Sequence, residues 1–298
     1  MTAPRQVLPG TTYLVTRRCS QRQLLLRPSK LTNDLFGFLL AVTAGRFGVQ
    51  VHAFCVMSNH VHLVLSDPAA RLPAFSQFLD SLVARSLNAA LGRWESFWAP
   101  SSYSAVALAT PGDVVAKTAY VLANPVAAGL VRHGRHWPGL WSAPDQIGAG
   151  ELEFRRPEHF FRTDGAMPDR ATLALVTPPG FASAEEFRLA LAGELAAQEE
   201  AATAARAAEG LDFLGVDRVL TQPPTAQPAP GEPRRALSPR VACQDKWKRI
   251  EALGRLVEFL RAYRRAWREW RAGLVGAVFP AGTYLVRVTH GVACAAPG

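Results

Sequence analysis

Two histidines interrupt an otherwise apolar segment and restrict how the chain can fold. Residues 51–66 read Val-His-Ala-Phe-Cys-Val-Met-Ser-Asn-His-Val-His-Leu-Val-Leu-Ser, which is typical of two buried strands. Side chains at i and i+2 of a strand share a face, so His60 and His62 are expected side by side. Two neutral imidazoles on a strand can bind a divalent metal and leave positions open for substrate or water. A pair of hydrogen-bonded core histidines, or a partly exposed strand end, is the alternative, with about equal weight.

The pattern of the first 108 residues predicts an α+β fold. Strands are predicted at residues 11–19, 49–57, 60–65 and 103–108, and helices at residues 31–44 and 73–91. The short polar connection Ser58-Asn59 predicts an antiparallel hairpin. The order is βαββαβ, that of a ferredoxin-like antiparallel sheet whose two helices cover one face. The other face is therefore available for binding.

A further predicted helix carries a tyrosine. Thr110-Pro111-Gly112-Asp113 has the residues of a helix start, and Pro125 is expected to end or kink the helix at Asn124. Tyr120 and Asn124 are four residues apart and share a face of the helix. The amide oxygen of Asn124 is a candidate third metal ligand beside the two imidazoles. Without the histidine pair, Tyr120 would be better explained as a core residue of an amphipathic helix.

These motifs together resemble those of the single-tyrosine HUH transposases, specifically the REP-associated tyrosine transposases. The resemblance is carried by Val-Met-Ser-Asn-His60-Val-His62-Leu-Val-Leu and by Tyr120-Val-Leu-Ala-Asn124-Pro125-Val-Ala-Ala-Gly129. It also includes Phe97-Trp98, Trp137-Pro138 and Trp141-Ser142, and it covers about residues 10–145. Ser58 stands where relatives frequently have proline, a difference expected to alter the turn and leave the ligands intact.

The resemblance implies a metal-dependent nuclease and strand transferase acting on single-stranded or hairpin DNA. Tyr120 would attack a phosphodiester to give a 5′-phosphotyrosine and a free 3′-hydroxyl, and His60, His62 and Asn124 would hold Mg²⁺ or Mn²⁺. No His-x-His-x-Asp-His spacing accompanies the histidines, which disfavours simple metal-assisted hydrolysis. The alternative is a DNA-hairpin-binding protein that has lost cleavage activity, because the long C-terminal region has no counterpart in the resemblance.

The charge of the chain agrees with a nucleic-acid partner but is uneven. Residues 1–145 hold 13 Lys/Arg and 6 Asp/Glu, residues 146–233 hold 7 and 14, and residues 234–298 hold 13 and 4. Basic segments therefore flank an acidic one. A GC-rich genome would also enrich arginine, so charge alone decides little. The arginines expected to contact DNA are Arg17, Arg18, Arg132, Arg135, Arg261, Arg264, Arg265 and Arg268.

The sequence predicts a division into a folded domain and a mainly helical C-terminal extension. The predicted segments are a catalytic domain at residues 1–145, an acidic helical segment at 146–220, a proline-rich linker at 221–240, and a basic helix with a terminal strand at 241–298. A capping box at Ser183–Glu186 begins the acidic helix. Two interpretations of the basic helix at 246–271 have equal weight. It binds single-stranded DNA through its arginines and aromatic residues, or it packs against a core with a solvated basic face.

Location and assembly are predicted from what the sequence lacks. No apolar run approaches the ~20 residues of a membrane-spanning helix, and the N-terminus has no signal-peptide pattern. We therefore expect no membrane partner and a cytoplasmic, nucleoid-associated protein. The four cysteines are dispersed, so reduced thiols are expected. A monomer and a homodimer both remain open.

Overall fold

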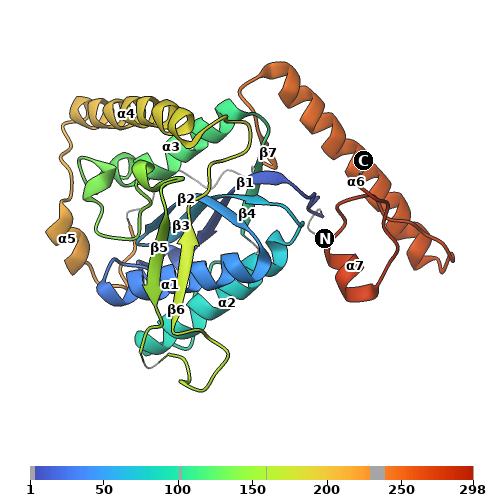
Figure 1. Ribbon diagram of the computed structural model, residues 1–298, viewed down its shortest axis with the longest axis horizontal. Coiled ribbons are helices and arrows are strands. Elements are labelled where there is room, and N and C mark those ends of the chain that lie inside the picture. Colours follow the sequence, from blue (N-terminus) through green and yellow to red (C-terminus); the bar gives the residue numbers. More distant parts are fainter. Residues whose placement is uncertain (1–3, 101–102, 159, 229–238, 298) are drawn as a thin grey trace.

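A five-stranded sheet forms the centre of the computed structural model, which describes residues 4–100, 103–158, 160–228 and 239–297 (Figure 1). The strands are β1 (Thr11–Arg18), β2 (Gln50–Met57), β3 (His60–Asp67), β4 (Ser104–Leu108) and β7 (Val241–Ala242), in the order β2-β3-β1-β4-β7. The first four pair antiparallel, and β7 joins β4 in parallel. The predicted α+β class and the predicted hairpin between β2 and β3 are confirmed.

Helices lie on both faces of this sheet. α1 (Lys30–Phe47) and α2 (Leu72–Ala90) pack against each other, while α3 (Pro111–Ala127) contacts β2 and β3 (Figure 1). Ser29 begins α1 by accepting a hydrogen bond from Thr32 N, and Thr110 begins α3 in the same way from Asp113 N. Large apolar side chains such as Phe38, Phe54 and Phe75 are fully buried around the sheet. Burial of this kind supplies most of the free energy of folding.

Pro125 does not end α3 at Asn124, which was one of the two outcomes expected from the sequence. The helix continues through Pro125 to Ala127, and Ala128 N still donates to Asn124 O at 2.9 Å. A proline in the last turn removes one intrahelical hydrogen bond, and burial of Pro125 and Val126 against the sheet offsets that loss. Asn124 is therefore held by a regular helix.

The acidic segment is only partly helical. Strands β5 (Glu151–Arg155) and β6 (Arg170–Ala174) form a hairpin that packs on α1 (Figure 1), so the prediction of an acidic helical segment does not hold for these residues. The alternation Glu-Leu-Glu-Phe-Arg explains the strand, because Leu152 and Phe154 point to the core. α4 (Ala184–Ala208) begins at the predicted Ser183 cap and packs on α3, and α5 (Val216–Thr221) follows.

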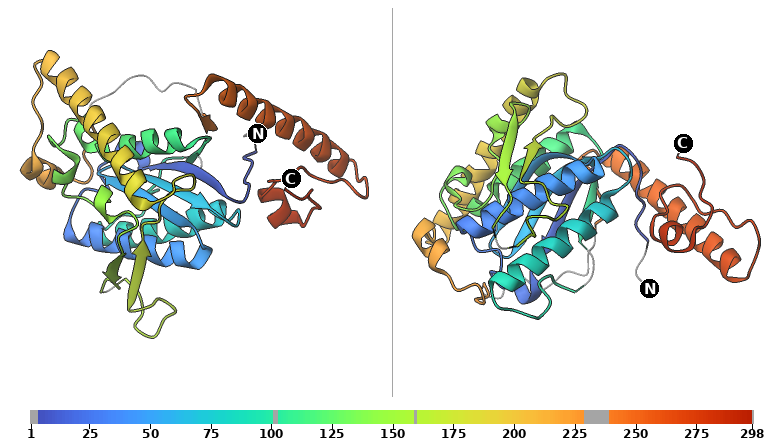
Figure 2. Two further views of the ribbon diagram at one scale, coloured as in Figure 1. Left: turned by 45° about the horizontal axis from the view of Figure 1, so that its top comes forward. Right: turned by 60° about the horizontal axis from the view of Figure 1, so that its bottom comes forward.

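The C-terminal part forms a small second core. α6 (Lys246–Arg271) extends away from the sheet, as Figure 1 and Figure 2 show. It packs through Tyr263, Ala266 and Trp270 on Phe279 and α7 (Leu285–His290). The terminal strand predicted after the basic helix is wrong, because residues 285–290 are helical and Gly291 ends the helix with φ 64°. Much of the predicted linker, residues 229–238, lies outside the described residues.

In the residues that the structure describes, no helix is both long and apolar enough to cross a membrane.

Candidate active site and metal centre

The strand register brings the two histidines together at one end of the sheet. β3 begins at His60, and the rings of His60 and His62 lie 4.7 Å apart between centroids at an interplanar angle of 86°. Across the β1–β3 pairing, Arg18 is the partner of His60 and Thr16 the partner of His62. His62 is buried and His60 half-buried, so one side of the pair is open to solvent.

The helix α3 adds the tyrosine and the amide to this pair. The rings of Tyr120 and His62 lie 5.5 Å apart between centroids, and Asn124 Nδ2 lies 3.3 Å from His62 Nε2. Tyr120 is 41% exposed, so its phenol is accessible to a ligand, whereas Asn124 is buried. The structure therefore brings together the four residues that the sequence singled out.

Two tryptophans fix α3 against the histidine hairpin. Trp141 Nε1 donates to Leu122 O on α3 at 3.0 Å, and Trp141 also forms a β-bridge with Cys55 of β2. Trp137 Nε1 donates to Val56 O at 2.9 Å, close to the turn before His60. The segment after α3, which includes the short helices Gly134–His136 and Pro144–Gln146, thus ties the tyrosine helix to the edge strand.

Each imidazole is oriented by a polar side chain at its Nδ1 atom. His60 Nδ1 lies 2.6 Å from Asn59 Oδ1, and because an amide oxygen only accepts, Nδ1 carries the proton. His62 Nδ1 lies 2.8 Å from the Thr16 hydroxyl, and its Nε2 faces Asn124. The lone pair of His60 therefore lies on Nε2, and that of His62 Nε2 accepts a hydrogen bond from the Asn124 amide nitrogen, which a bound ligand would replace. Partners of this kind at the second nitrogen orient histidines in metal sites.

Both histidines are neutral at neutral pH. The pKa of His60 is lowered to about 4, mainly by burial and then by the charge of Arg18, while a hydrogen bond with Asn124 offsets part of the lowering. Burial, the neighbouring His60 and Arg18 lower the pKa of His62 well below its usual value. A metal needs the neutral form of imidazole, so no proton has to leave before binding.

The residues present fit a divalent metal. Two imidazole lone pairs and one amide, whose oxygen faces the same space after rotation of the amide, make a three-atom donor set with positions left over. Within the described residues, no group of three or more His, Cys, Asp or Glu has the geometry to hold a metal ion. A centre at this place would therefore depend on the side-chain amide of Asn124.

Positive charge surrounds the site. Arg18 and Arg22 are both exposed and close enough to affect the pKa of His60. Lys117, one turn before Tyr120 on α3, places its Nζ 5.6 Å from the centre of the phenol ring. Cations in this arrangement suit the oxygens of a phosphodiester.

The remaining predicted arginines lie in different surroundings. Arg17 is mostly buried, with its Nε 3.1 Å from Asp80 Oδ2 and its guanidinium over Trp98. Arg132 pairs with Asp212 at 2.7 Å in the segment after α4, and Arg135 is exposed beside His136. The other four are exposed on α6, outside the histidine site: Arg261, Arg264, Arg265 and Arg268.

Four contributors to the site were not identified as such from the sequence. Thr16 acts through the β1–β3 register, which is a long-range property. Asn59 was recognised only as a turn residue, although its place next to His60 was a usable signal. Arg22 ends the short helix Ser20–Arg22, and its backbone oxygen accepts a hydrogen bond from Asn59 Nδ2 at 3.3 Å. Lys117 is three residues before Tyr120, so helical spacing could have found it.

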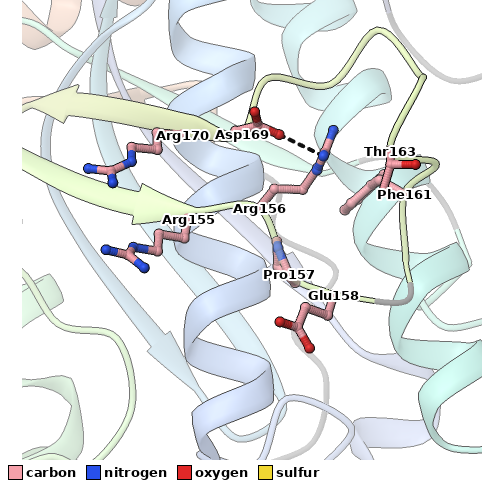
Figure 3. Close-up of a pocket in the computed structure, with 8 residues that line it drawn as sticks. All are labelled: Arg155, Arg156, Pro157, Glu158, Phe161, Thr163, Asp169 and Arg170. Atoms are coloured by element: carbon pink, nitrogen blue, oxygen red, sulfur yellow. Dashed lines mark ion pairs between the residues drawn. The ribbon is translucent and has the colours of Figure 1, made fainter.

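A cavity of about 480 Å³ lies elsewhere, at the end of the β5–β6 hairpin from which its connecting loop extends (Figure 3). Arg156 in its wall pairs with Asp169 at 2.6 Å, and Arg170 pairs with Glu153 at 2.8 Å. Arg155 and Arg170 point the same way from paired strands. The histidines and Tyr120 are not among its lining residues, so the cavity is separate from the candidate site.

Comparisons with known proteins give resemblance only at the level of solved structures. No protein-family model matches the chain, and no curated protein matches it. One similar structure is that of a REP-associated tyrosine transposase bound to a REP hairpin, with 18% identity, a TM-score of 0.40, and coverage of 47% of this chain and 81% of that chain. Another is a putative transposase from Deinococcus radiodurans, with 23% identity, a TM-score of 0.28, and coverage of 36% and 85%.

Proposed function

We propose that the chain is a metal-dependent endonuclease and strand transferase for single-stranded DNA, with Tyr120 as its nucleophile. The observation that carries the proposal is the convergence of a phenol, two oriented neutral imidazoles and an amide at one exposed point. The strand order and the helix on the open sheet face agree with a ferredoxin-like domain of the kind implied by the sequence motifs.

The chain supplies a nucleophile and a cationic surface for the phosphate. The Tyr120 oxygen attacks phosphorus and loses its proton, the bond from phosphorus to the 3′ oxygen breaks, and that oxygen gains a proton. Arg18, Arg22 and Lys117 compensate the negative charge of the phosphate oxygens. A bound Mg²⁺ or Mn²⁺ would supply Lewis-acid polarisation of the phosphate and would be held by His60, His62 and Asn124.

Covalent capture makes strand transfer possible. The phosphotyrosine keeps the phosphate as a diester, so a second 3′-hydroxyl can attack it, regenerate the phenol and rejoin DNA. Hydrolysis by water would instead leave a phosphomonoester that cannot be rejoined in this way. The 41% exposure of Tyr120 leaves room for the incoming strand end.

The test is covalent capture of labelled DNA. Hairpin-bearing single strands are incubated with the protein and Mg²⁺ or Mn²⁺ and analysed on denaturing gels, where the parent chain should give a protein–DNA adduct. Tyr120→Phe should give none, while the control Tyr284→Phe, a half-buried tyrosine at the start of α7, should match the parent. Equal adduct from Tyr120→Phe refutes the nucleophile. Tight hairpin binding without cleavage under any metal supports the binding-protein alternative instead.

A further inference from the structure

Trp94 is exposed to solvent, although the aromatic residues that follow it in the chain are buried. Trp94 is 93% exposed, whereas Phe97 and Trp98, three and four residues later, are 2% and 6% exposed. Trp98 Nε1 donates to Asp80 O at 2.8 Å, and the rings of Phe97 and Trp98 contact each other edge to face. The two buried aromatics anchor the loop between α2 and β4, and the indole of Trp94 is left on the surface.

The loop around Trp94 is fixed on both sides. Arg93 N donates to Asn88 O at 2.8 Å, and Asn88 Nδ2 donates to Glu95 O at 2.8 Å, so the end of α2 binds both neighbours of the tryptophan. Ser96 Oγ donates to Trp98 O at 2.7 Å. An exposed indole on a fixed loop loses little conformational entropy when a flat ligand stacks on it.

This loop belongs to the same end of the sheet as the histidine pair. Ser20 N donates to Phe97 O at 2.8 Å, and Ala99 N donates to Arg18 O at 2.9 Å. Arg18 is in turn the strand partner of His60. Positively charged side chains lie along the same connection. The charge of Arg93 affects the pKa of the buried Cys19 thiol, and the charges of Arg18 and Arg22 affect the pKa of His60.

We propose that Trp94 is a stacking platform for an unpaired base of the single strand whose phosphate lies at Tyr120. An aromatic face beside a cationic track is the combination that binds single-stranded nucleic acid, because stacking holds the base and arginines hold the backbone. The indole accepts any base, so it contributes affinity and strand placement with little sequence preference. The proposal rests on the proposed function for the identity of the ligand.

Binding in the absence of metal tests the platform without cleavage. A labelled hairpin with a single-stranded thymidylate overhang is titrated in EDTA with the full chain, and affinity is read by fluorescence anisotropy. Loss of one base stack in Trp94→Ala should weaken binding by about 5- to 150-fold. Trp94→Phe should recover most of the affinity. Leu189→Ala, which removes another highly exposed apolar side chain, is the control and should bind as the parent does.

Two further measurements separate stacking from damage to the loop. The salt dependence of affinity should be unchanged in Trp94→Ala, because no phosphate contact is lost. An abasic site moved along the overhang should weaken binding by the parent at one position, and at that position Trp94→Ala should add little further loss. Affinity of Trp94→Ala within twofold of the parent, or losses that add at every position, overturns the proposal and assigns the indole to a protein contact.

The covalent assay distinguishes failure of this inference from failure of the proposed function. Absence of a Tyr120-dependent adduct, with Trp94-dependent binding intact, refutes the chemistry and leaves the platform standing. A Tyr120-dependent adduct with affinity independent of Trp94 refutes the platform alone.

Discussion

At the scale of single residues, the side-chain amide of Asn59 is expected to control metal affinity without contacting the metal. It fixes the proton of His60 on Nδ1 and thereby directs Nε2 to the site. Asn59→Ala should weaken Mn²⁺ binding by roughly 10- to 100-fold, the range found when such supporting partners are removed. Electron paramagnetic resonance of free Mn²⁺ in a titration measures the affinity directly, independently of DNA cleavage.

Asn33→Ala provides the matched control, because Asn33 on α1 donates to a backbone carbonyl, Pro138 O at 2.9 Å, as Asn59 does to Arg22 O at 3.3 Å. Its Mn²⁺ affinity should equal that of the parent. Thr16→Val should resemble Asn59→Ala, because it removes the partner of His62 Nδ1. If Asn59→Ala and Thr16→Val both bind Mn²⁺ like the parent, the two imidazoles do not form the metal centre.

The sequence could predict those parts of the site whose residues are neighbours along one strand or one helix. The period of two along a strand placed His60 and His62 together, and the i, i+4 spacing of a helix did so for Tyr120 and Asn124. Thr16 is 46 residues from His62, and only the pairing of β1 with β3 brings them together. Such a partner cannot be read from one sequence, because strand register depends on the complete sheet.

At the scale of elements, the predictions succeeded where periodic patterns are long and failed where they are short. The central helices and strands were predicted within a few residues. Polar and apolar residues alternate in Glu151–Arg155 as in a strand, yet these five residues were assigned to a segment expected to be helical. Residues 285–290 also alternate, yet lie in a short helix that packs Val286 into the second core. Tertiary packing decides the structure of segments this short.

The contact between α1 and the β5–β6 hairpin gives a prediction for a glycine. A Cβ atom at Gly37 would overlap the ring of Phe154, which packs directly on the helix backbone. Gly37→Ala should therefore destabilise the fold by roughly 1–3 kcal/mol despite the better helix propensity of alanine. Gly45→Ala in the same helix has open space and should stabilise by about 0.5–1 kcal/mol. Urea unfolding measures both changes, and equal stabilisation by the two would mean that Phe154 does not pack on Gly37.

At the scale of the whole molecule, the acidic segment packs on the tyrosine helix, and two of its carboxylates bind groups of the loop that follows this helix. Glu199 accepts from Gly134 N at 2.7 Å, and Asp212 pairs with Arg132. These carboxylates sit beyond the end of α3 and neutralise the basic loop that follows it. Exposed positive charge remains beside the histidines, at Arg18 and Arg22, and on α6.

The basic helix α6 is expected to extend the DNA-binding surface beyond the sheet. Each phosphate contact that is lost should lower the salt slope of log affinity by roughly 0.7 for a single strand, because fewer counterions are released. Replacing Arg261, Arg264, Arg265 and Arg268 by glutamine should therefore weaken binding and flatten its salt dependence, measured by anisotropy at several salt concentrations. The covalent adduct at saturating DNA should be unchanged, since Tyr120 and the histidines are untouched. Arg155→Gln/Arg170→Gln on the hairpin is the control and should keep the parental slope. An unchanged slope in the α6 variant would mean that the helix contacts protein, and that the cations around the histidine site carry the binding alone.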